Sequence, residues 1–163
     1  SPSVIYCLRL LSMLNQIFSP ATDIIYRYGG DVDKYIGDCI FAVFEDSSKA
    51  LEATREILLL AHELQVKGNP FSVRMGLNAG RAIRANVGSS GRREYTFIGD
   101  AVNVAQRLES HCTPGRALIS EGLFDAAKDL FAVAERREIQ AKGKSQIIVA
   151  YECALEKPVS GNV

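Results

Sequence analysis

Two spacings of apolar residues alternate along this chain of 163 residues and predict most of its helices and strands. Between Ser47 and Val66 the apolar residues recur at helical spacing, and the sequence K-G-N-P that follows ends the predicted helix. The first residues show the same spacing from about Ser3, but Pro20 interrupts it. We therefore expect a helix that is kinked at Pro20, or a second short helix after it, ending at Gly29 and Gly30.

Short apolar runs bounded by turn residues predict the strands. The runs D-V-D-K-Y-I (31–36) and C-I-F-A-V-F (39–44) are separated by Gly37 and Asp38, which predicts a two-residue hairpin turn with glycine first. The segments 71–80 and 81–90 predict a second pair of strands. We expect a mobile loop at 89–93, where Gly, Ser and Arg gather.

Helical and strand patterns alternate along the rest of the chain. They predict helices at 99–111 and 121–130, a short strand at 117–120, and a hairpin of 132–141 and 145–154 across Lys142, Gly143 and Lys144. Helices and hairpins around one mixed sheet give an α+β sandwich.

The charge balance excludes two classes of partner. Lys and Arg total 19, as do Asp and Glu, so the field of the whole chain cannot recruit nucleic acid or an anionic membrane. No apolar run is long enough to span a bilayer and no signal peptide is visible. We therefore expect a cytosolic domain, or the cytosolic part of a larger protein.

Neither the histidines nor the cysteines have the spacing of metal ligands. We expect His62 and His111 to be surface or helix-end residues. Free buried thiols in a reducing compartment are the better interpretation of the four scattered cysteines, Cys7, Cys39, Cys112 and Cys153.

Two groups of polar residues that do not belong to the apolar pattern suggest a binding or catalytic site. Asp38 at a hairpin tip would suit a hard cation, although an isolated Gly-Asp is usually only a turn former. Asn103 and Arg107 are four residues apart and share one face of the predicted helix. An amide beside a guanidinium suits a ribose and a phosphate, although an ordinary amphipathic helix would also place one Asn and one Arg on its polar face.

Four segments in order carry a family resemblance: GGDVDKYIGDCIFAVF, SVRMGLNAGRAIRANVGS, REYTFIGDAVNVAQRLES and QAKGKSQIIVAYEC. Together they resemble the catalytic domain of class III nucleotidyl cyclases, which make cyclic AMP or cyclic GMP from the triphosphate. The resemblance implies a ferredoxin-like, palm-type mixed sheet with helices packed on it. It also implies a head-to-tail homodimer with sites shared between the subunits.

The resemblance also assigns the site residues. One subunit would supply Asp38 to two Mg²⁺ or Mn²⁺ ions and Arg74 to the phosphates. The second subunit would supply Lys34 and Thr96 to the base, Asn103 to the ribose, Arg107 to the charge at the α-phosphorus, and Lys142, or alternatively Lys144, to the terminal phosphates.

The residues at 34 and 96 favour ATP over GTP. Lys34 can donate to the bare N1 of adenine, and the Thr96 hydroxyl can accept from its amino group. Guanine carries a proton on N1 and would call for an acceptor at position 34. We therefore expect an adenylate cyclase that forms cyclic AMP and pyrophosphate.

One departure from the family concerns the metal. The family's first metal Asp follows a strand that precedes the first helix, whereas SPSVIYCL reads as the inside of that helix. We expect residues 1–157 to be a catalytic domain without that strand and Asp, with an incomplete sheet, weak metal binding and an upstream regulatory domain, and 158–163 to be a loose tail. Asn78, where the family more often has His, is a minor departure.

Three other functions stay open. A guanylate cyclase differs only in the base, and a diguanylate cyclase is suggested superficially by G-G-D-V-D. The third is a non-catalytic module that binds nucleotide or dimerises with a partner cyclase.

Overall fold

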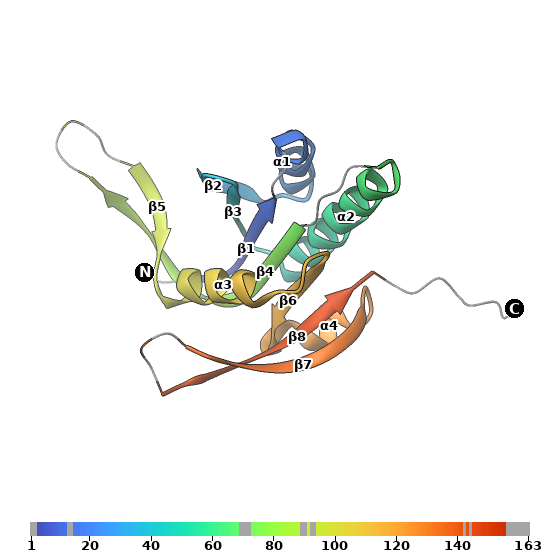
Figure 1. Cartoon of the computed structure of the whole chain (residues 1–163). Coiled ribbons are helices and arrows are strands. Elements are labelled where there is room, and N and C mark those ends of the chain that lie inside the picture. Colours follow the sequence, from blue (N-terminus) through green and yellow to red (C-terminus); the bar gives the residue numbers. More distant parts are fainter. Residues whose placement is uncertain are drawn as a thin grey trace, which may run out of the picture.

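One mixed sheet organises the chain, and helices cover both of its faces (Figure 1). The structure, a computed structural model, describes residues 3–12, 15–68, 73–88, 91, 94–141, 143 and 145–155. Its strands are β1 (Ser3–Ser12), β2 (Asp31–Ile36), β3 (Cys39–Phe44), β4 (Val73–Val87), β5 (Glu94–Ile98), β6 (Arg116–Ser120), β7 (Ala132–Gln140) and β8 (Ile147–Ala154).

The strand order is β2-β3-β1-β4-β6-β8-β7, with β5 paired to β4. The β4–β6 pair is parallel, and the other pairs are antiparallel. The helices are η1 (Asn15–Ile17), α1 (Phe18–Arg27), α2 (Ser47–Val66), α3 (Asp100–His111), η2 (Glu121–Leu123) and α4 (Phe124–Ala127). The α+β class and the mixed sheet are confirmed.

Strand β3 shows how the layers are built. Ile40, Ala42 and Phe44 belong to the main core, beneath α1, α2 and α4. Phe41 and Val43 point to the opposite face, where they join the cluster under α3. Because both faces are covered, the strand reads as a continuous apolar run rather than an alternating one.

Several local expectations are confirmed. The α2 helix spans the predicted residues, and the Asp46 side chain caps it by accepting from two backbone N–H groups. The β2–β3 turn consists of Gly37 and Asp38, with Gly37 at φ +55° and Asp38 at negative φ, as a type II′ turn requires. Helix α1 ends just before Gly29 (φ +80°).

The helix expected from Ser3 is wrong, because Ser3–Ser12 is strand β1 between β3 and β4. Side chains of this strand are buried on both faces: Cys7 joins the cluster under α3, whereas Leu8 and Leu10 join the main core. An apolar run buried on both sides cannot be told from a helix by periodicity alone. The sheet therefore has a strand at the place where we expected none.

Pro20 does not kink a long helix. It lies in the first turn of α1, where its missing N–H group leaves no hydrogen bond unmade. A short helix that ends just before the glycine pair is confirmed, but it begins at Phe18, ahead of Pro20, and follows strand β1 rather than a first long helix.

The strand pair expected from 71–90 is one strand, β4, and the partner of its second half is β5, a strand that the sequence did not predict. The β4–β5 hairpin extends away from the sheet (Figure 1). Its connecting residues lie mostly outside the described ranges, so the expected mobile loop at 89–93 stays a prediction. The helix expected at 121–130 is shorter, consisting of η2 and α4.

Two glycines of β4 allow α3 to pack closely on the strand, and neither is a turn residue. A Cβ at Gly76 would lie 2.5 Å from the carbonyl oxygen of Ala105, and one at Gly80 would lie 2.6 Å from the Cβ of Ala101. Asn78, between them, donates from Nδ2 to the Ala101 carbonyl at 2.9 Å. Helix α3 therefore lies directly on β4, which fixes the direction of its outer face.

The cysteines are buried free thiols, as expected. Burial raises the pKa of Cys39 to about 11 and that of Cys7, Cys112 and Cys153 to about 12, so none is ionised at neutral pH. His62 is exposed on α2 and His111 ends α3. Within the described residues, none of the helices combines the length and apolar character needed to cross a membrane.

Candidate active site

Lys34 and Thr96, which come from different strands, meet in the structure. The Lys34 ammonium on β2 donates to the Thr96 hydroxyl on β5 at 2.6 Å, and both residues are half-buried. Lys34 also lies over the ring of Phe41, 5.6 Å from its centroid, which places it on the α3 side of the sheet. The sequence analysis assigned these two residues to one base, and the structure brings them into direct contact.

Asp33 joins this pair, and the sequence analysis missed it. The Thr96 hydroxyl donates to Asp33 Oδ2 at 2.7 Å, the backbone N–H of Phe97 donates to the same oxygen at 3.4 Å, and Lys34 Nζ lies 3.5 Å away. The Asp33 side chain is only 3% exposed. We call these three side chains the Asp33–Lys34–Thr96 cluster.

A β-bulge makes this cluster possible. Val32 pairs with Ala42 and Lys34 pairs with Phe41, so Asp33 is an extra residue in β2. Neighbouring residues of a regular strand point to opposite faces, whereas a bulge re-aims them. In the sequence, Asp33 stands out only as an acidic residue directly before Lys34. The spacing of apolar and polar residues in β2 does not indicate the bulge.

A groove beside α3 contains the second pair of predicted residues. Arg107 Nε donates to the carbonyl oxygen of Gln140 at 3.1 Å, which anchors the guanidinium at the end of β7. Asn103 and Arg107 share one face of α3, as their spacing predicted. The groove has a volume of about 410 Å³ and is lined by Asp100, Asn103, Val104, Gln106, Arg107, Ser110, Ala141 and Ile148. We call it the α3 groove.

Asp38 is exposed at the tip of the β2–β3 turn, and its carbonyl oxygen accepts from the backbone N–H of Ser12 at 3.0 Å. Among the described residues, no three His, Cys, Asp or Glu side chains gather where they could hold a metal ion. The adjacent strand β1 has no Asp or Glu. One carboxylate fits a Mg²⁺ ion that takes its other ligands from water and substrate phosphates, but it is too few to hold two ions by itself.

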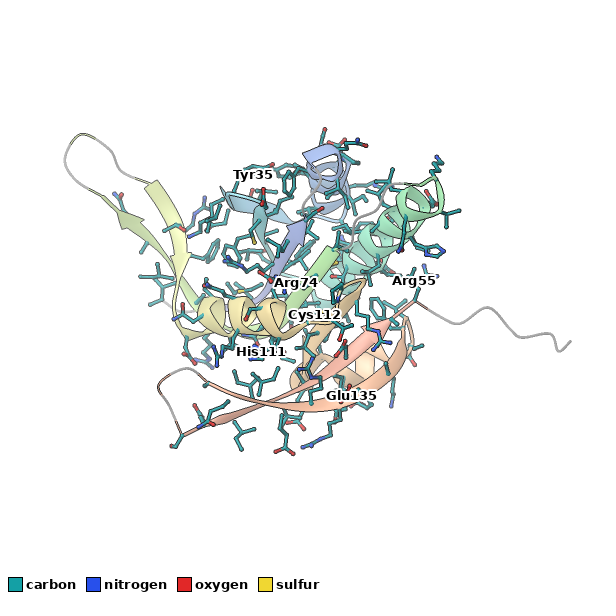
Figure 2. All side chains as sticks on the ribbon, viewed as in Figure 1. Tyr35, Arg55, Arg74, His111, Cys112 and Glu135 are labelled. Atoms are coloured by element: carbon teal, nitrogen blue, oxygen red, sulfur yellow. The ribbon has the colours of Figure 1, made fainter. Side chains whose placement is uncertain are left out.

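Arg74, predicted to reach phosphates, lies on β4 beside α3 (Figure 2). Its guanidinium is 3.5 Å from Glu109 of α3, and Arg9 of β1 contacts the same carboxylate at 3.2 Å. The Glu109 side chain is 5% exposed, so it needs these cations as partners. The structure does not place Arg74 in the Asp33–Lys34–Thr96 cluster or on the lining of the α3 groove. Lys142 and Lys144 lie outside the described residues.

A family model described as the adenylate and guanylate cyclase catalytic domain matches residues 4–152. The chain belongs to this family. It is 32% identical over 157 residues to the terminal-differentiation specific adenylate cyclase of Dictyostelium discoideum, covering 88% of this chain and 7% of that protein. It is also 32% identical over 143 residues to an adenylate cyclase of Mycobacterium tuberculosis, covering 83% of this chain and 32% of that protein.

Solved structures of both specificities resemble this cyclase domain. The guanylyl cyclase Cya2 has a TM-score of 0.82 at 27% identity, covering 98% of this chain and 96% of that one. The adenylyl cyclase CyaB from P. aeruginosa has a TM-score of 0.83 at 25% identity, covering 96% of each chain. The cyclase fold expected from the sequence is thus confirmed. The chain covers only 7% of the Dictyostelium relative's length and 32% of the Mycobacterium relative's length.

Proposed function

We propose that this domain is an adenylate cyclase that converts ATP to 3′,5′-cyclic AMP and pyrophosphate. The observation that carries the proposal is the 2.6 Å contact between Lys34 and Thr96. It sets an ammonium donor beside a hydroxyl, and the Watson–Crick edge of adenine presents an acceptor, N1, beside a donor, its amino group. Guanine has the opposite pattern at both positions and would meet the ammonium with an N–H group.

The α3 groove is the proposed place of the ribose and the α-phosphate. Asn103 would hydrogen-bond the ribose, and Arg107 would stabilise the negative charge that grows at the α-phosphorus during transfer. Because its Nε is already bonded to the Gln140 carbonyl, the guanidinium is oriented before the substrate arrives. Such preorganised charge is a large contribution in phosphoryl chemistry. Lys142, or alternatively Lys144, would contact the terminal phosphates.

We propose that Asp38 binds Mg²⁺ or Mn²⁺ together with the nucleotide phosphates, and that two ions are present in the complete site. When bound, such ions activate the ribose 3′-hydroxyl and neutralise the triphosphate and its leaving group. To reach the phosphates, Arg74 is proposed to release Glu109, which would keep its contact with Arg9.

We further propose that the sites form between two copies of the domain arranged head to tail. Asp38 and Arg74 would come from one copy, and the α3 groove and the Asp33–Lys34–Thr96 cluster from the other. Large apolar side chains on β2, β4 and β5 support an interface there, since Ile36, Ile83 and Ile98 are each between 45% and 48% exposed. We propose a cytoplasmic domain with a regulatory domain upstream, and the much greater length of the curated relatives is consistent with further domains in the whole protein.

The test is to incubate the chain with ATP or GTP in the presence of Mg²⁺ or Mn²⁺ and to measure both cyclic nucleotides. We expect metal-dependent cyclic AMP formation that exceeds cyclic GMP formation and rises faster than linearly with protein concentration, as dimer assembly requires. Preferential cyclic GMP formation would reject the assignment of the base.

A second candidate function is a non-catalytic module that binds the nucleotide. It is favoured by the presence of only one carboxylate, Asp38, at the proposed metal site among the described residues, and by the ion pair of Arg74 with Glu109. Tight ATP binding without any cyclic AMP formation, at protein concentrations where dimers are present, would support this alternative.

A further inference from the structure

The Thr96 hydroxyl is held between a donor and an acceptor within one chain. Lys34 donates to its oxygen at 2.6 Å, and the hydroxyl donates its own proton to Asp33 at 2.7 Å. A hydroxyl has one proton and two lone pairs, and it ordinarily rotates to suit whatever it meets. Here the proton and one lone pair are already used, so only the second lone pair can face a ligand.

We propose that Asp33 is a specificity-determining positioning residue, which makes Thr96 an obligate hydrogen-bond acceptor by taking its proton. This inference rests on the proposed function. In this state Thr96 accepts from the 6-amino group of adenine and opposes the 6-oxo group of guanine. Without Asp33 the hydroxyl could rotate and donate, and a threonine alone would discriminate poorly between the two bases.

Burial makes the arrangement durable. The Asp33 side chain is 3% exposed, and its Oδ2 also receives the Phe97 N–H at 3.4 Å and lies 3.5 Å from the Lys34 ammonium. With the Thr96 hydroxyl, the Phe97 N–H and the Lys34 ammonium all directed at Oδ2, this oxygen is held in the role of an acceptor. The bulge in β2 serves this arrangement, since it lets Asp33 and Lys34 both reach Thr96.

The experiment separates this role from a purely structural one. The substrates are ATP, GTP and purine riboside triphosphate, which keeps N1 but lacks the 6-amino group. Asp33→Leu keeps the branched shape of the side chain, although it is larger, and has no acceptor, and Asp33→Asn is the matched control. In Asp33→Asn the amide oxygen should take the Oδ2 position, because the Phe97 N–H and Lys34 select an acceptor there.

In Asp33→Leu, we expect the preference for ATP over purine riboside triphosphate in kcat/KM to fall roughly tenfold, the scale of one lost hydrogen bond to substrate. The preference for ATP over GTP should fall with it. If Asp33→Leu also makes Lys34 more mobile, the contact with N1 weakens equally for ATP and for the analogue. That effect therefore cancels in the ratio of kcat/KM for ATP to kcat/KM for purine riboside triphosphate. Asp33→Asn should keep both ratios within about twofold of the parent, since the acceptor remains.

The inference is overturned if Asp33→Leu keeps the parent's ratios, or if Asp33→Asn loses them as fully as Asp33→Leu. If Asp33→Leu does not fold, Asp33→Ala and Asp33→Asn give the same comparison. Competitive binding of the three nucleotides gives the ratios if turnover is too slow. A parent that does not favour ATP over the analogue contradicts the proposed reading of adenine by Thr96, and this outcome is separate from any effect at Asp33.

Discussion

The Asp33–Lys34–Thr96 cluster and the turn at Asp38 are only a few residues apart along β2 and its turn, yet they are built differently. The cluster is buried at its centre and its polar atoms are bonded to one another. Asp38 is exposed, and no metal-binding group of side chains surrounds it among the described residues. One chain therefore suffices to orient the groups proposed to read the base, whereas the proposed metal site needs the nucleotide and a second subunit to be completed.

The strongest test of this contrast is Asp38→Asn. It should abolish cyclic AMP formation while the fold and the dimer survive, because a turn accepts Asn as readily as Asp and, among the described residues, the carboxylate has no hydrogen-bond or ion-pair partner to lose. Activity with Mg²⁺ and Mn²⁺, far-UV circular dichroism and sedimentation would be measured together. Turnover within a few-fold of the parent would show that Asp38 is not the metal ligand.

Arg107→Ala should lower kcat by roughly 10²–10³, the usual scale for losing one preorganised charge donor, and should change KM for ATP less. Steady-state kinetics with ATP measures both. A raised KM with an unchanged kcat would make Arg107 a ground-state binding residue instead.

Mixing two inactive variants tests whether the two regions belong to different subunits of one site. In a mixed dimer of Asp38→Ala and Arg107→Ala, one site carries both defects and the other carries none. Random exchange makes about half of the dimers mixed, so activity should return to roughly a quarter of the parent. A mixture that stays inactive after proven subunit exchange would place both residues in one chain's site.

Reversing the polarity of the cluster should change the base that is preferred. Lys34→Glu with Thr96→Cys supplies an acceptor to N1–H of guanine and removes the acceptor for the adenine amino group, so the ATP-to-GTP ratio in kcat/KM should fall by about tenfold or more. Lys34→Glu alone should reduce ATP turnover. The assignment fails if both variants keep the parent's ratio.

A change far from both regions should affect stability alone. Burial by itself would raise the pKa of Glu152, but the Thr113 N–H, Arg137 and Arg116 lower it below its usual value. A carboxyl group whose pKa is lower in the folded state stabilises the fold at pH values above its pKa in the unfolded chain. This contribution is lost as the pH falls through the folded-state pKa. Glu152→Gln should therefore lower Tm at pH 7, and the difference from the parent should shrink in acid below about pH 4.5. Thermal melts across pH measure it, and the ATP-to-GTP ratio serves as the control that should not move.

The sequence predicted elements best where one face is polar or a turn is explicit. Helix α2 was predicted to the residue because its apolar face and the stop after Val66 are unambiguous. Strand β1 was predicted as a helix because it is buried on both faces, and β5 was not predicted at all. The pairing of Asn103 and Arg107 followed from helical spacing.

What the sequence could not show depends on close approach between distant segments. Asp33 reaches Thr96 through a bulge that no local pattern records. The sequence analysis gave no role to Gly76 or Gly80, and only the packing of α3 explains them. The engagement of Arg74 by Glu109 joins residues 35 positions apart, and the sequence spacing does not indicate it.

Strand β4 runs without a break from beneath α3 into the hairpin that carries Thr96. The first half supports the groove of Asn103 and Arg107, and in the second half Ala85 pairs with Thr96 itself. Because one continuous strand connects both places, a movement of the hairpin would shift them together. A partner that turned this hairpin would therefore change the proposed base selection and the proposed catalytic groove with a single movement, and the two properties would be difficult to regulate separately.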